Sequence, residues 1–240
     1  MSAVRVLQEL KILAKPGKAI ELQRFFQTKP GQYGEGDIFL GVMVPQTRSV
    51  ASRHQGLPLD EIEKLTASVF HEARLCGLII LVNQYKKAIS RAEKKRIFTF
   101  YMKQMRLGRI NNWDLVDVTA PTIGEFLLEE KDPLKLLIRL AKSKSLWERR
   151  LSIIFTFAFQ SAGELDETYA IAELLLEDSH DLIHKAVGWS LREMGKRDPS
   201  LLRLFLQEYY PQMPRTMLRY SIERLPERER KSWLAKESRV

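Results

Sequence analysis

A basic and aromatic stripe in the last third of the chain has residue types that could do chemistry: Lys185, Trp189, Arg192 and Lys196. Its members recur at spacings of four, three and four residues, so they share one face of a single helix. The residues expected to face the core lie roughly opposite: Ile183, Val187, Leu191 and Met194. Because cations bind phosphates and an aromatic ring stacks on bases or sugars, this face is typical of a nucleic-acid-binding surface.

A second candidate is the pair formed by Trp113 and Asp117, which are four residues apart and would share a helical face. Leu115 and Val118 would point the other way. The spacing alone favours a structural interpretation, in which Asp117 caps a helix or pairs with a cation and Trp113 belongs to the core. The functional alternative is a carboxylate with a chemical purpose, since an acidic group otherwise opposes the electrostatics of binding DNA.

Composition limits the classes of function. The chain has 240 residues, 45% of them hydrophobic, which is enough to bury a real core, and its formal net charge is +9, which favours a polyanionic partner. The single cysteine, Cys76, lies in an apolar run, so we interpret it as a small buried hydrophobe in a reducing compartment. The sequence shows neither a membrane span nor a signal peptide, and we expect a cytoplasmic protein.

Metal chemistry has little support in the sequence. The four histidines do not combine with cysteine or carboxylates at the spacings of zinc ligands. His180 and His184 are four residues apart on an expected helix and could hold a metal, but we favour solvated or phosphate-facing side chains. We therefore expect no metal and no cofactor.

Nearly every segment has the 3.6-residue periodicity of a helix, so the predicted fold class is all-α. The exception is a glycine-rich connector from Thr28 to Pro45, which lacks the pattern of a phosphate-binding loop. The expected helices are 3–14, 18–27, 59–88 (as two helices), 92–106, 132–143, 146–161, 166–178, 181–196, 200–209, 214–224 and 227–236.

Weak internal similarity relates these helices to one another. Residues 146–155 resemble residues 182–191 at a shift of 36, and residues 71–75 resemble residues 147–151 at a shift of 76. Two-helix units of this size are typical of HEAT-like solenoids. We predict a single domain over residues 1–240, built as a right-handed superhelical solenoid of about six HEAT-like repeats with a concave basic groove.

Three separated motifs together resemble the AlkD-like family of bacterial DNA alkylation-repair glycosylases. They are WDLVD at 113–117 followed by Pro121, LWERR at 146–150, and KAVGWSLRE at 185–193. A fourth similarity is FLGV at 39–42 in the connector. The resemblance implies an all-helical HEAT-like protein that removes positively charged purines, 3-methyladenine and 7-methylguanine, from double-stranded DNA. It also implies a monomer without an obligate protein partner that acts at the bacterial nucleoid.

The resemblance also implies roles for single residues. Trp113 and Trp189 would line the lesion site, Asp117 would be the catalytic carboxylate, and Arg150 and Arg192 would lie in the DNA-facing groove. In this arrangement the carboxylate stabilises the cationic sugar that forms as the glycosidic bond stretches.

Other details of the resemblance concern DNA contacts. Tyr33 is a plausible match to a groove tyrosine, and Lys185 and Lys196 join the DNA contacts through the stripe. The chain departs from its relatives at Asp181 and Leu182, where relatives can carry aromatic residues, and this affects the backbone contacts expected there.

Two other functions fit parts of the sequence. A catalytically silent HEAT-like protein could bind bent or branched DNA with the same basic surface, although such proteins lack the Trp and Asp of the first motif. A helical scaffold could instead dock an acidic protein on the exposed tryptophans. The affinity for duplex DNA and its dependence on salt would separate these alternatives.

Overall fold

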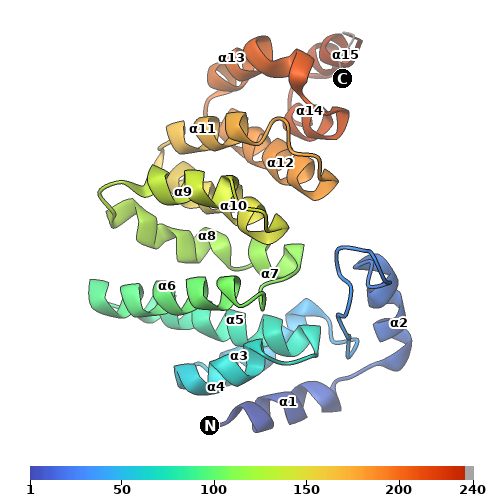
Figure 1. Ribbon diagram of the computed structural model, residues 1–240, viewed down its shortest axis with the longest axis vertical. Coiled ribbons are helices and arrows are strands. Elements are labelled where there is room, and N and C mark those ends of the chain that lie inside the picture. Colours follow the sequence, from blue (N-terminus) through green and yellow to red (C-terminus); the bar gives the residue numbers. More distant parts are fainter. Residues whose placement is uncertain (236–240) are drawn as a thin grey trace. The chain divides into compact units, whose positions relative to one another are not determined.

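The computed structural model describes residues 1–235, and the regular elements of this part of the chain are all helices, with one isolated bridge between Ile38 and Phe70 and no strand (Figure 1). The predicted all-α class is therefore confirmed. The chain forms two compact units, one ending at Ile123 and the other beginning at Gly124. The superhelical hand, the basic groove and the single-domain organisation stay predictions.

The first unit is built around one helix that is buried along most of its length, α5. Its apolar residues occur all around the helix, so every face must be covered by a neighbour. α3 and α4 supply most of that cover, and α1, α6, α7 and α8 also touch it. The helices of this unit are α1 (Ala3–Ile12), α2 (Pro16–Phe25), α3 (Val44–Arg53), α4 (Leu59–Thr66), α5 (His71–Lys87), α6 (Arg91–Arg106), α7 (Trp113–Asp117) and α8 (Ala120–Ile123).

The second unit is built around two long helices, α10 and α12. The four residues expected to be buried on α12 are all fully buried, which confirms that part of the amphipathic pattern. α14 packs so closely on α12 that a Cβ atom at Gly188 would lie 2.6 Å from the carbonyl oxygen of Met217. The elements are η1 (Gly124–Glu129), α9 (Pro133–Ala141), α10 (Leu146–Ala162), α11 (Asp166–Leu174), α12 (Asp181–Arg197), α13 (Pro199–Tyr209), η2 (Tyr210–Gln212), α14 (Arg215–Ser221) and α15 (Glu227–Ala235).

The expected helix ranges omit α3 and the short helix α8, and α7 is expected only as the helical face shared by Trp113 and Asp117. The sequence pattern predicts that the glycine-rich connector ends at Pro45, but α3 already begins at Val44. Pro45 lies in the first turn of α3, where a proline starts a helix because its missing N–H has no partner there in any case. The residue that suggested a break is therefore a helix start, and the connector spans only 26–43.

The internal repeat is present in local structure, but its register differs by one residue from the sequence comparison. α5, α10 and α12 each have 17 residues, and α10 begins 75 residues after α5, at Leu146 against His71. Arg74 donates to the carbonyls six and five residues before it, and Arg149 does the same. Arg149, not Arg150, is thus the counterpart of Arg74.

The connector is fixed by a buried carboxylate. Glu72 accepts the backbone N–H groups of Leu40, Gly41 and Val42 at 2.8–3.1 Å. Gly41 has a φ of 83° and packs so tightly that a Cβ atom would lie 2.2 Å from the carbonyl oxygen of Lys15. Glycine is required there for both reasons. The glycine-rich segment thus allows close packing of the backbone, and its N–H groups donate to the carboxylate of Glu72.

One further observation concerns burial. Cys76 is fully buried, and burial raises the pKa of its thiol to about 12, so the interpretation of Cys76 as a buried hydrophobe is confirmed.

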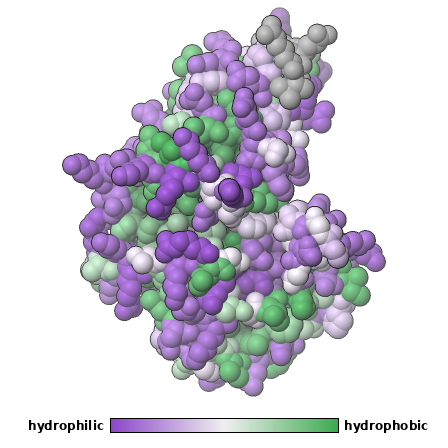
Figure 2. All heavy atoms as spheres, in the orientation of Figure 1, coloured by the Kyte–Doolittle hydropathy of each residue, from purple (hydrophilic) through white to green (hydrophobic). Residues whose placement is uncertain are grey.

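Among residues 1–235, no helix is both long enough and apolar enough to cross a membrane. Figure 2 shows polar and charged side chains over much of the visible face, with apolar ones between them.

Candidate functional site

The first sequence motif forms the short helix α7. Asn112 caps its start by accepting the N–H of Trp113 at 2.9 Å. The indole of Trp113 is half-buried and stacks on Phe26, with ring centroids 5.2 Å apart and an interplanar angle of 16°. Phe25 meets the same indole edge-on at 6.0 Å, although Phe25 itself is 64% exposed. Trp113 therefore lies at the boundary between the core and an aromatic surface.

Asp117 is the last residue of α7, one helical turn after Trp113, and it is also half-buried. Leu115 and Val116, between them in sequence, are fully buried and anchor the helix. Burial raises the pKa of the neighbouring Tyr101, and the charge of Asp117 raises it further. The structure thus presents an indole and a carboxylate on successive turns of a helix whose other side is fixed in the core.

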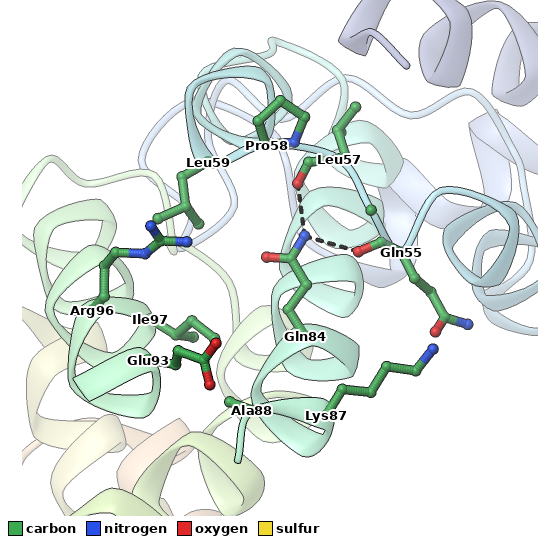
Figure 3. A pocket seen from close by; sticks show the side chains of 11 residues that line it. Gln55, Leu57, Pro58, Leu59, Gln84, Lys87, Ala88, Glu93, Arg96 and Ile97 are labelled. Atoms are coloured by element: carbon green, nitrogen blue, oxygen red, sulfur yellow. Dashed lines mark hydrogen bonds between the residues drawn. The ribbon is translucent and has the colours of Figure 1, made fainter. Parts of the chain in front are cut away.

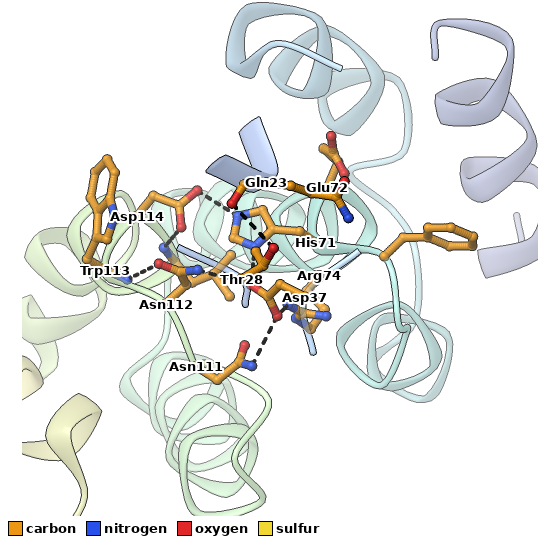
Figure 4. Close-up of polar contacts among 12 residues, drawn as sticks. Gln23, Thr28, Asp37, His71, Glu72, Arg74, Asn111, Asn112, Trp113 and Asp114 are labelled. Carbon is orange, nitrogen blue, oxygen red and sulfur yellow. Dashed lines mark hydrogen bonds and ion pairs between the residues drawn. The ribbon is translucent and has the colours of Figure 1, made fainter. Parts of the chain in front are cut away.

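A buried cluster of charges underlies α7. The imidazole of His71 lies between two carboxylates, with Nδ1 2.9 Å from Asp37 and Nε2 2.8 Å from Asp114 (Figure 4). Arg74 forms an ion pair with the other oxygen of Asp37. Asn112 also donates to Asp37, at 3.0 Å. The cluster joins the connector, α5 and α7 through groups that are almost fully covered.

Charge explains the protonation of this cluster. Burial alone would lower the pKa of His71, but the charges and hydrogen bonds of Asp114 and Asp37 raise it to about 9. Burial raises the pKa of Asp37, but hydrogen bonds from His71 and Asn112 and the charge of Arg74 outweigh that effect and lower it overall. At neutral pH the protonated His71 therefore lies beside the ionised Asp37.

The stripe on α12 lies in the second unit, and its tryptophan is again half-buried. The ring centroid of Trp189 is 4.6 Å from that of Phe157 on α10. The cations of the stripe are paired with carboxylates at the surface. Lys185 bonds Asp181 at 2.7 Å, and Lys196 bonds Glu193 at 2.7 Å.

Arg192 has two acidic partners. It bonds Glu193 at 3.2 Å and also pairs with Glu223 from beyond α14. A phosphate that binds this face would therefore replace protein carboxylates as the partner of each stripe cation.

Two other predicted DNA-binding residues contact backbone carbonyls. Arg150 is only 5% exposed and donates to the carbonyl of Leu182 at the start of α12. Tyr33 is half-buried, and its hydroxyl donates to the carbonyl of Phe25 at 3.4 Å. Since Phe25 lies beside Trp113, the structure brings Tyr33 into the neighbourhood of the first motif. The roles of these residues in binding DNA stay predictions.

The two histidines considered as metal ligands have protein partners instead. His180 caps α12 by accepting the N–H of Leu182 at 3.1 Å. His184 bonds the carbonyl of Asp178. Within the described residues, no group of three histidine, cysteine or acidic side chains is arranged to hold a metal ion.

Several residues of the first site are not found by sequence analysis. Phe25, Phe26, Asp37, His71 and Asp114 converge there from the connector, α2, α5 and α7. Their separations in sequence are too long for helical periodicity to relate them. The one sequence feature that could have indicated this site is the adjacent pair Phe25 and Phe26 at the end of an amphipathic helix. Neighbouring residues on a helix point in different directions, so one of the two had to face water.

One hollow in the surface lies away from both tryptophans. A pocket of about 360 Å³ lies between the α3–α4 turn and the ends of α5 and α6. Gln84 fills its side by donating to the carbonyls of Gln55 and Leu57, at 2.9 and 2.6 Å (Figure 3). Lys87, Glu93 and Arg96 line it with mixed charge. We interpret it as a structural joint between helices.

Residues 6–225 match the sequence pattern of a family described as DNA alkylation repair enzyme. The chain belongs to this family. A comparison with curated proteins finds no significant match. Among solved structures, the DNA alkylation repair family member is similar to a predicted DNA alkylation repair enzyme from Enterococcus faecalis, with a TM-score of 0.69 and 16% sequence identity over 89% of this chain and 97% of the other.

Proposed function

We propose that this protein is a monofunctional DNA glycosylase that hydrolyses the N-glycosidic bond of positively charged N3- or N7-alkylated purines in double-stranded DNA. The observation that carries the proposal is the pair on α7, where an indole and a carboxylate one turn apart are both half-buried. Membership of the alkylation repair family supports the substrate class. We propose further that residues 1–240 act as one domain, as a monomer and without a cofactor.

The substrate determines how little chemistry the protein must supply. An alkylated purine that already carries a positive charge is a good leaving group, so no general acid is needed to protonate it. As the glycosidic bond stretches, positive charge develops on the deoxyribose. Asp117 would stabilise that charge and orient or deprotonate the attacking water. The indole faces of Trp113 and Trp189 would attract the cationic nucleotide at about 0.5–2 kcal/mol each.

The α12 stripe would bind the DNA backbone in this proposal. Lys185, Arg192 and Lys196 would exchange their carboxylate partners for phosphates, and release of counterions from the DNA would drive the exchange. Arg150 and Tyr33 would add contacts at the edges of the groove. These contacts position the duplex and carry no selectivity for the lesion, which would depend on the α7 pair and on Trp189.

The decisive experiment compares lesions that differ in charge. Duplexes of one sequence carrying 7-methylguanine, 3-methyladenine, hypoxanthine or 1,N6-ethenoadenine are incubated with excess protein, and the released base is quantified. We expect release of the two cationic bases and none of the neutral ones, since the proposed reaction uses no acid catalyst to protonate a neutral leaving group. Release of hypoxanthine at a comparable rate would contradict the charge-selective mechanism.

The same duplexes separate the competing functions. A protein that binds every duplex with strong salt dependence but releases no base is a silent DNA binder. Failure to bind duplex DNA at low salt would leave the protein-scaffold function instead.

A further inference from the structure

The helix that carries the α7 pair cannot hold itself in place. α7 has five residues, which is far below the length at which an isolated helix is stable in water. The orientation of Trp113 and Asp117 must therefore come from contacts with the rest of the first unit. The charged contact from α7 into the buried cluster beneath it is made by Asp114, which bonds His71.

His71 is placed to set that orientation. Its two ring nitrogens bond carboxylates from different elements, Asp37 in the connector and Asp114 in α7. Both nitrogens can donate only when the imidazole is protonated. His71, Asp37 and Asp114 are each no more than 6% exposed, so water cannot substitute for a lost partner. Figure 4 shows His71 reaching both acids from the start of α5.

A cluster of three rings, in which Phe26 and Phe39 both contact His71, provides a second link from His71 to the same helix. The imidazole stacks on Phe39 at 4.4 Å, and Phe39 stacks on Phe26 at 4.9 Å. Phe26 in turn stacks on Trp113. Phe26 therefore contacts both the indole that would meet the lesion and the imidazole whose Nε2 bonds the next residue, Asp114.

We propose that His71 is a positioning residue for base excision, because it ties the connector to α7 and so fixes the indole of Trp113 and the carboxylate of Asp117. This inference rests on the proposed function. His71 itself does not touch DNA in the proposal, and it acts through the α7 pair.

The two hydrogen bonds of His71, which tie the connector to α7, both depend on its protonation. The charges around His71 determine the pH at which this tie is lost. The charged groups that face His71 are Asp37 from the connector, Asp114 from α7 and Arg74 from α5, while Glu72 binds the connector N–H groups instead. The pKa of His71 is raised to about 9, above the usual 6.5. The tie is therefore complete below pH 6.5 and is lost as the pH rises through about 9.

The test is the pH profile of single-turnover excision of 7-methylguanine, with protein-free duplex at each pH to correct for spontaneous loss. We expect the wild-type rate to fall above about pH 9. His71→Gln should lower the rate at pH 7 by about 10²-fold, with duplex affinity changed less than about threefold, because a misplaced carboxylate costs catalysis and not phosphate contacts. A folded His71→Gln protein with wild-type excision would overturn the inference.

Asp114→Asn tests the same role of His71 if the His71→Gln protein does not fold. It removes one of the two charges that hold His71 protonated but keeps the size and an acceptor oxygen, so the alkaline fall should move down by about 1–3 pH units. The matched control is Glu72→Gln, which removes a neighbouring buried charge that contacts only the connector. Its alkaline fall should stay near pH 9. Equal shifts in the two variants would show a merely structural role.

A spectroscopic readout separates failure of this inference from failure of the proposed function. Protein labelled with 5-fluorotryptophan gives a ¹⁹F resonance for Trp113, which Trp113→Phe assigns. That resonance should titrate with a midpoint near pH 9 in the wild type and lower in Asp114→Asn. If the protein released no base but the resonance titrated in this way, the tie would stand and the glycosylase proposal would fall. A Trp113 resonance that did not change between pH 7 and 10 would overturn the tie.

Discussion

The two tryptophans of interest are presented by opposite means. Trp113 lies on a helix of five residues that is held by a buried charge cluster and a cluster of aromatic rings. Trp189 lies on a helix of 17 residues whose fully buried apolar face packs against α10, α13 and α14. One side chain is positioned by distant parts of its unit and the other by the helix that carries it.

The charges near the two tryptophans differ in the same way. Around α7 they are buried and mutually satisfied, so each partner is fixed and costly to remove. Around α12 they are less buried, and exposed pairs such as Lys185 with Asp181 contribute little to stability and exchange partners readily. A fixed cluster suits a group that must be held at a reacting bond, and exchangeable pairs suit contacts with a flexible phosphate backbone.

The strongest test of this contrast is Asp117→Asn. We expect excision of 7-methylguanine to fall by about 10²–10³-fold or more under single-turnover conditions, because the charge that stabilises the sugar cation is lost while side-chain size is kept. Duplex affinity should stay the same or increase slightly, since a negative charge has been removed. A parallel loss of affinity and excision would instead identify Asp117 as structural.

The pH dependence of the wild-type rate tests Asp117 without a substitution, because protonation also removes its charge. A carboxylate must be ionised to act, so excision should fall at acidic pH as Asp117 becomes protonated. A rate that stays flat down to pH 4 would remove Asp117 from the mechanism.

The two groups of charges should also differ in how much they stabilise the fold. Asp37→Asn should lower the free energy of unfolding by about 3 kcal/mol, because it leaves the buried cations His71 and Arg74 short of a charge. Asp181→Asn, which removes the partner of Lys185 at the surface, should change it by at most about 0.5 kcal/mol. Urea denaturation of the two single variants at pH 7 measures both values. Equal losses would mean that the two regions do not differ as described.

The contrast also explains what could be predicted from the sequence. The α12 stripe and its opposite face follow from periodicity within one helix, and the buried half of that pattern is confirmed. The support for α7 could not be predicted in this way, because His71 bonds groups 34 residues before it and 43 residues after it. Trp113 and Asp117 were found as a pair, but a pattern of spacing carries no information about the ring stack and the charges that hold them. Pro45 shows a related limit, since a proline marks either the end of a helix or its first turn.

The smallest expected effects concern the α12 stripe, and they separate its cations from its tryptophan. Lys185→Ala and Arg192→Ala should each weaken binding to modified and unmodified duplexes alike and reduce the slope of log affinity against log salt by about one unit. Arg192→Ala should weaken binding more than Lys185→Ala, because it removes the cation that pairs with Glu223 and one of the two that pair with Glu193, and so leaves more negative charge near the phosphates. Trp189→Ala should leave the slope unchanged and lower mainly the excision of cationic lesions, since an indole binds the charged nucleotide and releases no counterion. Fluorescence anisotropy at several salt concentrations gives the slopes, and single-turnover excision gives the rates. If all three variants lose affinity with the same change in slope, Trp189 belongs to the phosphate contacts, and only the α7 pair would then distinguish the lesion.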